Sequence, residues 1–232
     1  MPTEVLVQFV ILVLSLAMLL FAVRRLSARP STTLRTKTRS AAAAAQSNRH
    51  FLRASSLLVR ARSSPTHHSH RAQAPTLARA ALAEAEAAIS QSPKDAAPHV
   101  LKALALDSLG RRSSALRSLD LALSAPRARS LSGRERAEAL ARRAELKLGM
   151  GVGAAAAAGR GRRRRRRAES AAEDAREAVR AAPGEAPAWR VLGECCERKG
   201  LREEARRAFE EALRIEPGCD PARHGLDRLG SS

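Results

Sequence analysis

The sequence contains very few aromatic residues: one tryptophan, four phenylalanines and no tyrosine in 232 residues. Two of the phenylalanines, Phe9 and Phe21, lie in one apolar segment near the N-terminus. Proteins that bind single-stranded nucleic acid stack the bases on several aromatic faces gathered on one surface. This chain cannot supply such a surface, which argues against nucleic acid as its main partner.

Cysteines and catalytic motifs are also scarce. The three cysteines, Cys195, Cys196 and Cys219, are too few for a disulfide framework and favour a reducing compartment. The glycine-rich stretch 151–161 lacks the Lys-Ser/Thr ending of a phosphate loop, and no HExxH or GxSxG motif occurs. The run His67–His70 has no paired cysteines or acidic ligands beside it, so a solvated loop is expected. The sequence therefore predicts that the protein is not an enzyme and that it binds no cofactor, metal ion or small-molecule substrate.

Negative charge is missing from a long part of the chain. The range 5–83 holds no Asp or Glu but twelve Lys and Arg. Seven more arginines, Arg160 and the run Arg162–Arg167, complete the net charge of +19, so the remainder is neutral. A nucleic-acid-binding domain carries its basic face on the folded body, whereas here the excess lies in low-complexity segments. Binding of a polyanion, nucleic acid or anionic lipid, through these segments is kept as an alternative function.

One apolar segment, 5–23, runs for 19 residues without a charge, and Gln8 and Ser15 are its only polar residues. At 1.5 Å per residue it matches a hydrocarbon core of about 30 Å. A cleaved signal peptide would begin with basic residues and have a shorter apolar core, so a transmembrane anchor is predicted. Basic residues follow the segment and none precedes it. This predicts a single-pass protein of an endomembrane or organelle outer membrane, with residues 1–4 translocated and the rest cytosolic.

Residues 24–75 are predicted to be a basic linker rich in Ser, Thr and Ala. Within it, apolar residues at helical spacing after Ser47, a suitable N-cap, predict a helix over 47–62. The basic stretch can rest on anionic lipid headgroups. Its composition also resembles a transit peptide, which leaves import into a plastid or mitochondrion as an alternative.

Helical stretches follow at regular intervals, and four of them end at prolines that are 33, 57 and 34 residues apart: Pro93, Pro126, Pro183 and Pro217. Small or apolar residues precede these prolines at nearly constant distances. A period near 34 with small residues at fixed places indicates stacked helical hairpins. The small residues let paired helices approach closely, and the proline ends each second helix.

The most regular copy of the repeat spans residues 186–217. It has a W, L, G, G, A, F, A, P pattern at Trp189, Leu192, Gly193, Gly200, Ala205, Phe209, Ala212 and Pro217. In these residues it closely resembles the tetratricopeptide repeat (TPR) family. The resemblance covers roughly residues 76–230. It implies an all-α, right-handed superhelix of three to four stacked hairpins, closed by a polar helix and here preceded by the single transmembrane helix. The chain departs from the family pattern in lacking tyrosine, in using alanine for several large residues, and in having His99 where Trp189 stands.

The 57-residue interval places a low-complexity insertion, 150–167, in the turn of the third hairpin. It is rich in Ala and Gly and contains the arginine run. Turns at the edge of a solenoid tolerate insertions, so a solvated, disordered loop is expected here.

In the TPR family the first helices of the hairpins line a concave groove that binds peptides. The register of the resemblance assigns six charged residues to this groove: Arg136, Arg143, Lys147, Arg190, Glu194 and Arg198. The family's asparagine–lysine clamp for a C-terminal carboxylate is not expected, because Asn48 is the only asparagine and lies outside the regular repeats. The predicted function is a membrane-anchored scaffold or adaptor that presents TPR-like repeats to a protein or peptide partner. Alternatives are a polyanion-binding protein and an organelle-imported TPR assembly factor.

Overall fold

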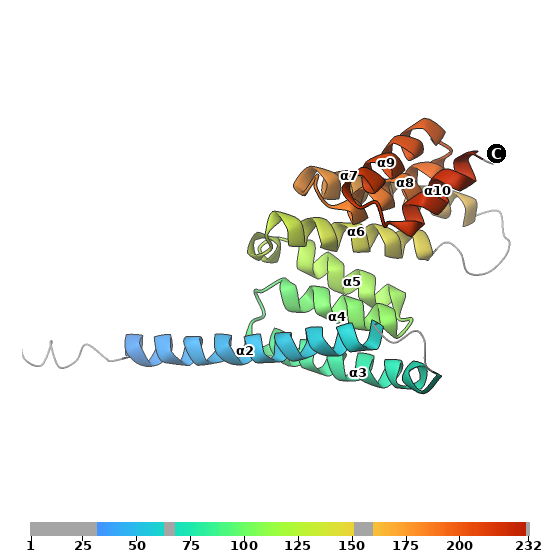
Figure 1. Ribbon diagram of the computed structural model, residues 1–232. Coiled ribbons are helices and arrows are strands. Elements are labelled where there is room, and N and C mark those ends of the chain that lie inside the picture. Colours follow the sequence, from blue (N-terminus) through green and yellow to red (C-terminus); the bar gives the residue numbers. More distant parts are fainter. Residues whose placement is uncertain (1–31, 63–67, 151–159, 231–232) are drawn as a thin grey trace, which may run out of the picture. The chain divides into compact units, whose positions relative to one another are not determined.

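The computed structural model describes residues 32–62, 68–150 and 160–230 (Figure 1). Within these ranges all regular elements are helices and no strand occurs. The chain divides into one unit of residues 1–45 and a second, compact unit of residues 46–232. The predicted anchor, 5–23, lies outside the described residues. Among the helices that are described, none combines the length and the apolar character needed to cross a bilayer.

Consecutive helices pair into hairpins. The pairs are α2 (Thr32–Arg62) with α3 (His68–Gln91), α4 (Ala97–Ser108) with α5 (Arg112–Leu123), α6 (Gly133–Gly149) with α7 (Arg160–Ala181), and α8 (Ala186–Lys199) with α9 (Arg202–Ile215). A short 3-10 helix, η1 (Arg127–Ser130), precedes α6, and α10 (Asp220–Gly230) follows the last hairpin. Arg228 of α10 donates to both carboxylate oxygens of Glu197 in α8 at 2.8 Å, which holds the closing helix against the last hairpin.

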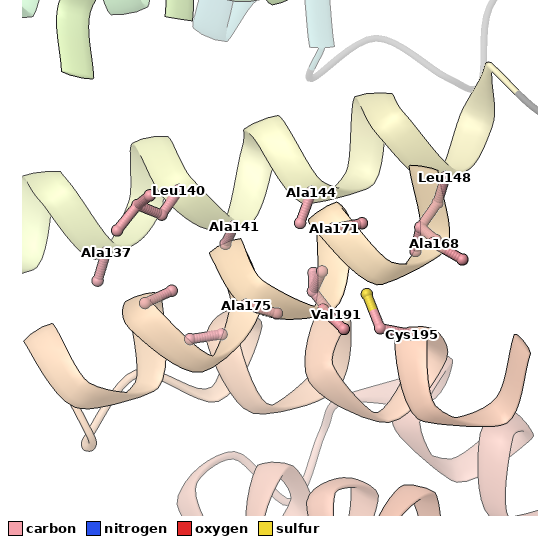
Figure 2. Packing of buried hydrophobic residues seen from close by; sticks show 13 residues of the cluster. Ala137, Leu140, Ala141, Ala144, Leu148, Ala168, Ala171, Ala175, Val191 and Cys195 are labelled. Carbon is pink, nitrogen blue, oxygen red and sulfur yellow. The ribbon is translucent and has the colours of Figure 1, made fainter. Parts of the chain in front are cut away.

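Each second helix buries three residues at a spacing of four and then three, at the positions predicted from the prolines. They are Ala81, Ala85 and Ala88 in α3, Ala115, Leu119 and Ala122 in α5, Ala171, Ala175 and Ala178 in α7, and Ala205, Phe209 and Ala212 in α9. All are at most 1% exposed. Ten of these twelve residues are alanine, whose small side chain allows the two helix backbones of a hairpin to approach closely. Figure 2 shows Ala171 of α7 beside Ala144 of α6, and Ala175 belongs to the same core cluster.

The first helices also share a pattern of core residues, spaced by three, one and three. In α8 these residues are Trp189, Leu192, Gly193 and Cys196, and in α6 they are Ala137, Leu140, Ala141 and Ala144. The two sets contact the second helix of their own hairpin. This equivalence fixes the register between the third and fourth hairpins.

Two segments that were predicted to be irregular are helical. The linker is helical from Thr32, because residues 32–62 contain neither Gly nor Pro and the run 41–45 is alanine, the strongest helix former. Helix α3 likewise starts at His68, ahead of Pro75. The arginine run forms the first turns of α7 from Arg160 onward instead of a disordered loop, since arginine also favours helix. The remainder of the insertion, 151–159, lies outside the described residues.

His99 occupies the place of Trp189 in the second hairpin and is only 7% exposed. In the fourth hairpin Trp189 Nε1 donates to the carbonyl of Pro183 at 2.8 Å. The corresponding carbonyl, that of Pro93, instead accepts from Arg127 Nε at 3.0 Å. Neither ring nitrogen of His99 has a hydrogen-bond partner among the described residues. The exchange of tryptophan for histidine therefore leaves a buried polar ring unsatisfied.

Replacing His99 with Leu is expected to raise the free energy of unfolding at pH 7 by about 1 kcal/mol, because an unsatisfied buried polar group is removed. Burial lowers the pKa of His99, the charges of Arg127 and Lys102 lower it further, and Asp95 opposes them. Below a pH of about 6.5 His99 is therefore protonated in the unfolded chain but stays neutral in the folded chain, so protonation favours unfolding.

The wild type should accordingly lose about 1 kcal/mol between roughly pH 7.5 and 5.5, and His99→Leu should not show this loss. Urea unfolding followed by circular dichroism measures both effects. The matched control is His224→Leu, since His224 is 72% exposed. A parallel decline of stability with pH in the wild type and in His99→Leu would contradict the assignment.

Candidate functional site

Two of the predicted groove residues, Arg143 and Lys147, lie against the second helix of their own hairpin. Arg143 donates from Nη2 and Nε to the two carboxylate oxygens of Asp174 at 2.6 and 3.0 Å. Lys147 Nζ donates to Asp174 Oδ2 at 2.6 Å and to Ser170 Oγ at 2.8 Å. Burial alone would lower the pKa of Arg143, but the hydrogen bond and the charge of Asp174 raise it overall. These two cations serve to neutralise a buried aspartate.

The other four predicted residues also have intramolecular contacts. Arg136 pairs with Glu177 of α7 at 2.5 Å. Arg190 contacts Glu194 at 2.5 Å and also Glu145 of α6. Arg198 donates to a backbone carbonyl at the end of α6 at 2.7 Å. The structure thus does not bring the six residues together as one free charged surface.

A shift in register explains why the α6 residues lie elsewhere. Arg143 and Lys147 would be the equivalents of Glu194 and Arg198 if Gly149 were the equivalent of Gly200. Gly200 ends α8 in the left-handed region at φ +79°, whereas Gly149 lies within α6, which is capped by Met150. By the shared core pattern, the equivalents of Arg190, Glu194 and Arg198 in α6 are Glu138, Arg142 and Leu146. The core spacing of α6 was visible in the sequence and would have given this register.

A hollow of about 220 Å³ lies between α6 and the start of α8. Its floor consists of Ala137, Ala141 and Ala188, which are 1 to 3% exposed. Alanine at these positions leaves the space that a larger side chain would fill. Charged residues and one proline surround the floor: Arg134, Glu138, Arg142, Glu145, Glu185 and Pro187. The hollow is therefore apolar at its base and polar at its rim, the pattern of a site for a side chain of a partner.

The rim charges are mostly paired. Arg134 contacts Glu185 at 2.9 Å, and Arg142 contacts Glu145 at 3.0 Å. Glu138 is exposed and makes no ion pair within 4.0 Å in the described part of the chain. This carboxylate is the rim group that is available to a basic residue of a ligand.

The C-terminal end of α2 lies on the same side as the hollow. The pKa of Arg62 is lowered by burial and by the charge of Arg142, and it is partly restored by carboxylates that include Glu138. Arg62 shares one helix face with Leu52 and Val59, which are 64 and 65% exposed. Leu52 and Val59 are thus two large apolar side chains exposed to solvent on α2.

The three cysteines are buried and form no disulfide. Burial raises the pKa of Cys195 to about 12 and also raises that of Cys196. A thiol with a raised pKa is a poor nucleophile because little thiolate is present. Among the described residues there is likewise no group of three His, Cys, Asp or Glu side chains that could hold a metal ion.

Comparisons with known proteins show the fold. The thermophilic TPR protein TTC0263 of Thermus thermophilus superposes with a TM-score of 0.54 at 23% identity, over 68% of this chain and 76% of that one. MamA of Desulfovibrio magneticus RS-1 superposes with a TM-score of 0.46 at 17% identity, over 69% of this chain and 86% of that one. No protein-family model matches the sequence, and no curated protein matches it either. The chain therefore has a TPR-like helical repeat fold.

Proposed function

We propose that this protein is a scaffold that binds a peptide segment of a partner protein in the hollow between α6 and α8. The alanine floor carries the proposal, because it leaves space for a side chain between two neighbouring first helices. The fitting ligand is a segment with an apolar side chain for the hollow and a Lys or Arg for Glu138. The proposed role is binding of a partner protein, without a catalytic step.

We further propose that residues 5–23 anchor the protein in an endomembrane or organelle outer membrane, with the helical unit in the cytosol. The support is the uncharged 19-residue segment followed by basic residues, which belongs to the sequence alone. An imported TPR assembly factor remains the second candidate, favoured by the absence of acidic residues over 5–83.

One experiment tests both parts. A photo-crosslinking amino acid at position 138 of the full chain should form an adduct with the partner in cells, and the adduct should remain in the membrane pellet after alkaline carbonate extraction. Ala188→Leu, which fills the hollow, should reduce the adduct by about ten-fold while leaving the protein helical. A crosslinker at the exposed Arg129 is the control position and should give no adduct that depends on Ala188.

The outcomes separate the two proposals. An adduct that is insensitive to Ala188→Leu would contradict binding in the hollow. An adduct found in the carbonate supernatant would contradict the anchor and leave the binding site intact. Loss of residues 5–23 during maturation, read from the N-terminal sequence of the purified protein, would favour import instead.

A further inference from the structure

Three turns that are far apart in the sequence meet at the C-terminal end of α6. Arg112 of α5 donates to the carbonyl of Gly149 at 3.1 Å, and Arg167 of α7 donates to that of Met150 at 3.3 Å. Arg198 of α8 donates to the carbonyl of Leu148 at 2.7 Å. The last carbonyls of a helix lack intrahelical partners and carry partial negative charge, so they attract cations. The turns of the second, third and fourth hairpins are thereby held side by side.

More positive charge lies beside these three arginines. We call the whole set the basic edge: Arg111, Arg112, Arg165, Arg166, Arg167, Arg198 and Lys199, all of them exposed. For Arg111, Arg165, Arg166 and Lys199 the described part of the chain supplies no ion pair within 4.0 Å. Of the nearby acidic residues, Glu197 pairs with Arg228, and Glu169, one helical turn after Arg165 in α7, makes no ion pair within 4.0 Å among the described residues. The basic edge is therefore a surface whose charge is not neutralised internally.

The loops that join successive hairpins have a different composition. They carry both signs, with Lys94, Arg127 and Arg129 against Asp95, Glu185, Glu216 and Asp220. The excess of positive charge is thus specific to the turns within the second, third and fourth hairpins. A net charge spread evenly over the surface would not produce this difference.

We propose that the basic edge binds the anionic headgroups of a lipid membrane. The guanidinium group of arginine binds phosphate with two parallel hydrogen bonds. Several exposed guanidinium groups on neighbouring turns therefore suit a surface that presents many phosphates. Each Lys or Arg near an anionic bilayer contributes on the order of 1 kcal/mol to binding. Nucleic acid fits less well, because the described aromatic residues Phe51, Trp189 and Phe209 pack against the core clusters and none lies on the basic edge to stack a base. This binding does not require residues 5–23 to be an anchor.

The test uses the full-length protein and sedimentation with two kinds of vesicle, pure phosphatidylcholine and phosphatidylcholine containing 30% phosphatidylserine, about one lipid in three. The edge variant combines Arg111→Gln, Arg165→Gln, Arg166→Gln and Lys199→Gln. Its partition onto the anionic vesicles should fall by a factor on the order of 100 relative to wild type. The control variant removes the same charge elsewhere, with Arg79→Gln, Lys94→Gln, Arg129→Gln and Arg180→Gln at exposed positions. It should retain most of the binding.

The outcomes of this test, together with a parallel measurement of affinity for duplex DNA, decide the proposal. Equal losses in the two variants would mean that only net charge matters, and they would overturn the proposal. An edge variant that binds anionic vesicles as well as wild type would also overturn it. If the edge variant loses affinity for duplex DNA but keeps its affinity for the anionic vesicles, the partner of the edge is nucleic acid and the lipid proposal is wrong. Binding to neutral vesicles that is equal in all three proteins measures the anchor. If no protein binds neutral vesicles but wild type still binds anionic vesicles more tightly than the edge variant, the result contradicts the proposed membrane anchor and supports lipid binding by the basic edge.

Discussion

Replacing Asp174 with Leu is expected to lower the free energy of unfolding by about 3 kcal/mol, a large effect for the loss of one carboxylate. The Asp174 side chain is 7% exposed, and its partners Arg143 and Lys147 are 19 and 16% exposed. Removing the anion leaves two cations close together with little solvent to screen them. Asp120 also contacts Arg143, at 3.2 Å, but it is 55% exposed and pairs with Arg143 only, so the charge of Lys147 would remain without a partner.

Urea unfolding of the variant, followed by circular dichroism, measures this loss. The rescue variant adds Arg143→Met and Lys147→Met to Asp174→Leu and should recover most of the stability, since an apolar cluster of similar volume replaces a buried ion network. The matched control is Glu177→Leu on the same helix. Its pair with Arg136 is about 40% exposed on both sides and should contribute at most about 1 kcal/mol. An unfolding midpoint of Asp174→Leu equal to that of wild type would show that the network adds no stability.

The Asp174 network also shows where sequence reasoning succeeded and where it failed. The alanine positions in the second helices follow from counting back from a proline, because the proline ends the helix and fixes the count. Their burial in the structure matches that count in four hairpins. Arg143 and Lys147 had no comparable marker. A shift of one residue in the register turns a side chain by about 100° around the helix, so a small error in register changes which residues of α6 face the groove.

The hollow between α6 and α8 was missed for a related reason. Single alanines such as Ala141 and Ala188 read as ordinary core residues, and only the packing of two first helices shows that the space beside them is unfilled. Arg160–Arg167 are helical, although their low complexity predicts a disordered loop. Helix propensity, which is high for both alanine and arginine, would have predicted the opposite.

Phe209 forms the centre of the fourth hairpin. It is fully buried, and its ring lies between two glycines of neighbouring helices, Gly193 of α8 and Gly225 of α10. A Cβ atom on Gly193 would lie 2.5 Å from the ring, and one on Gly225 would lie 2.6 Å from it. Both distances are far below a van der Waals contact. The two glycines are therefore required by the ring, and Trp189 packs against the same cluster.

The expected cost of Phe209→Ala is about 3 to 4 kcal/mol, because a fully enclosed ring is removed and the surrounding helices collapse only in part. Gly193→Ala alone should cost about 2 kcal/mol by overpacking, although alanine is the better helix former. The two sites should be strongly coupled. In a Phe209→Leu background, Gly193→Ala should be nearly neutral, since the smaller side chain gives room for the added methyl group.

Unfolding free energies of the two single variants, Gly193→Ala and Phe209→Leu, and of their double variant give this coupling directly. Gly184→Ala is the control, since a Cβ atom there meets nothing within 4 Å. Additive effects of Gly193→Ala and Phe209→Leu would mean that the ring does not occupy the space beside Gly193. A positive coupling of about 2 kcal/mol would instead establish that contact, and with it the register of α8 on which the position of the hollow depends.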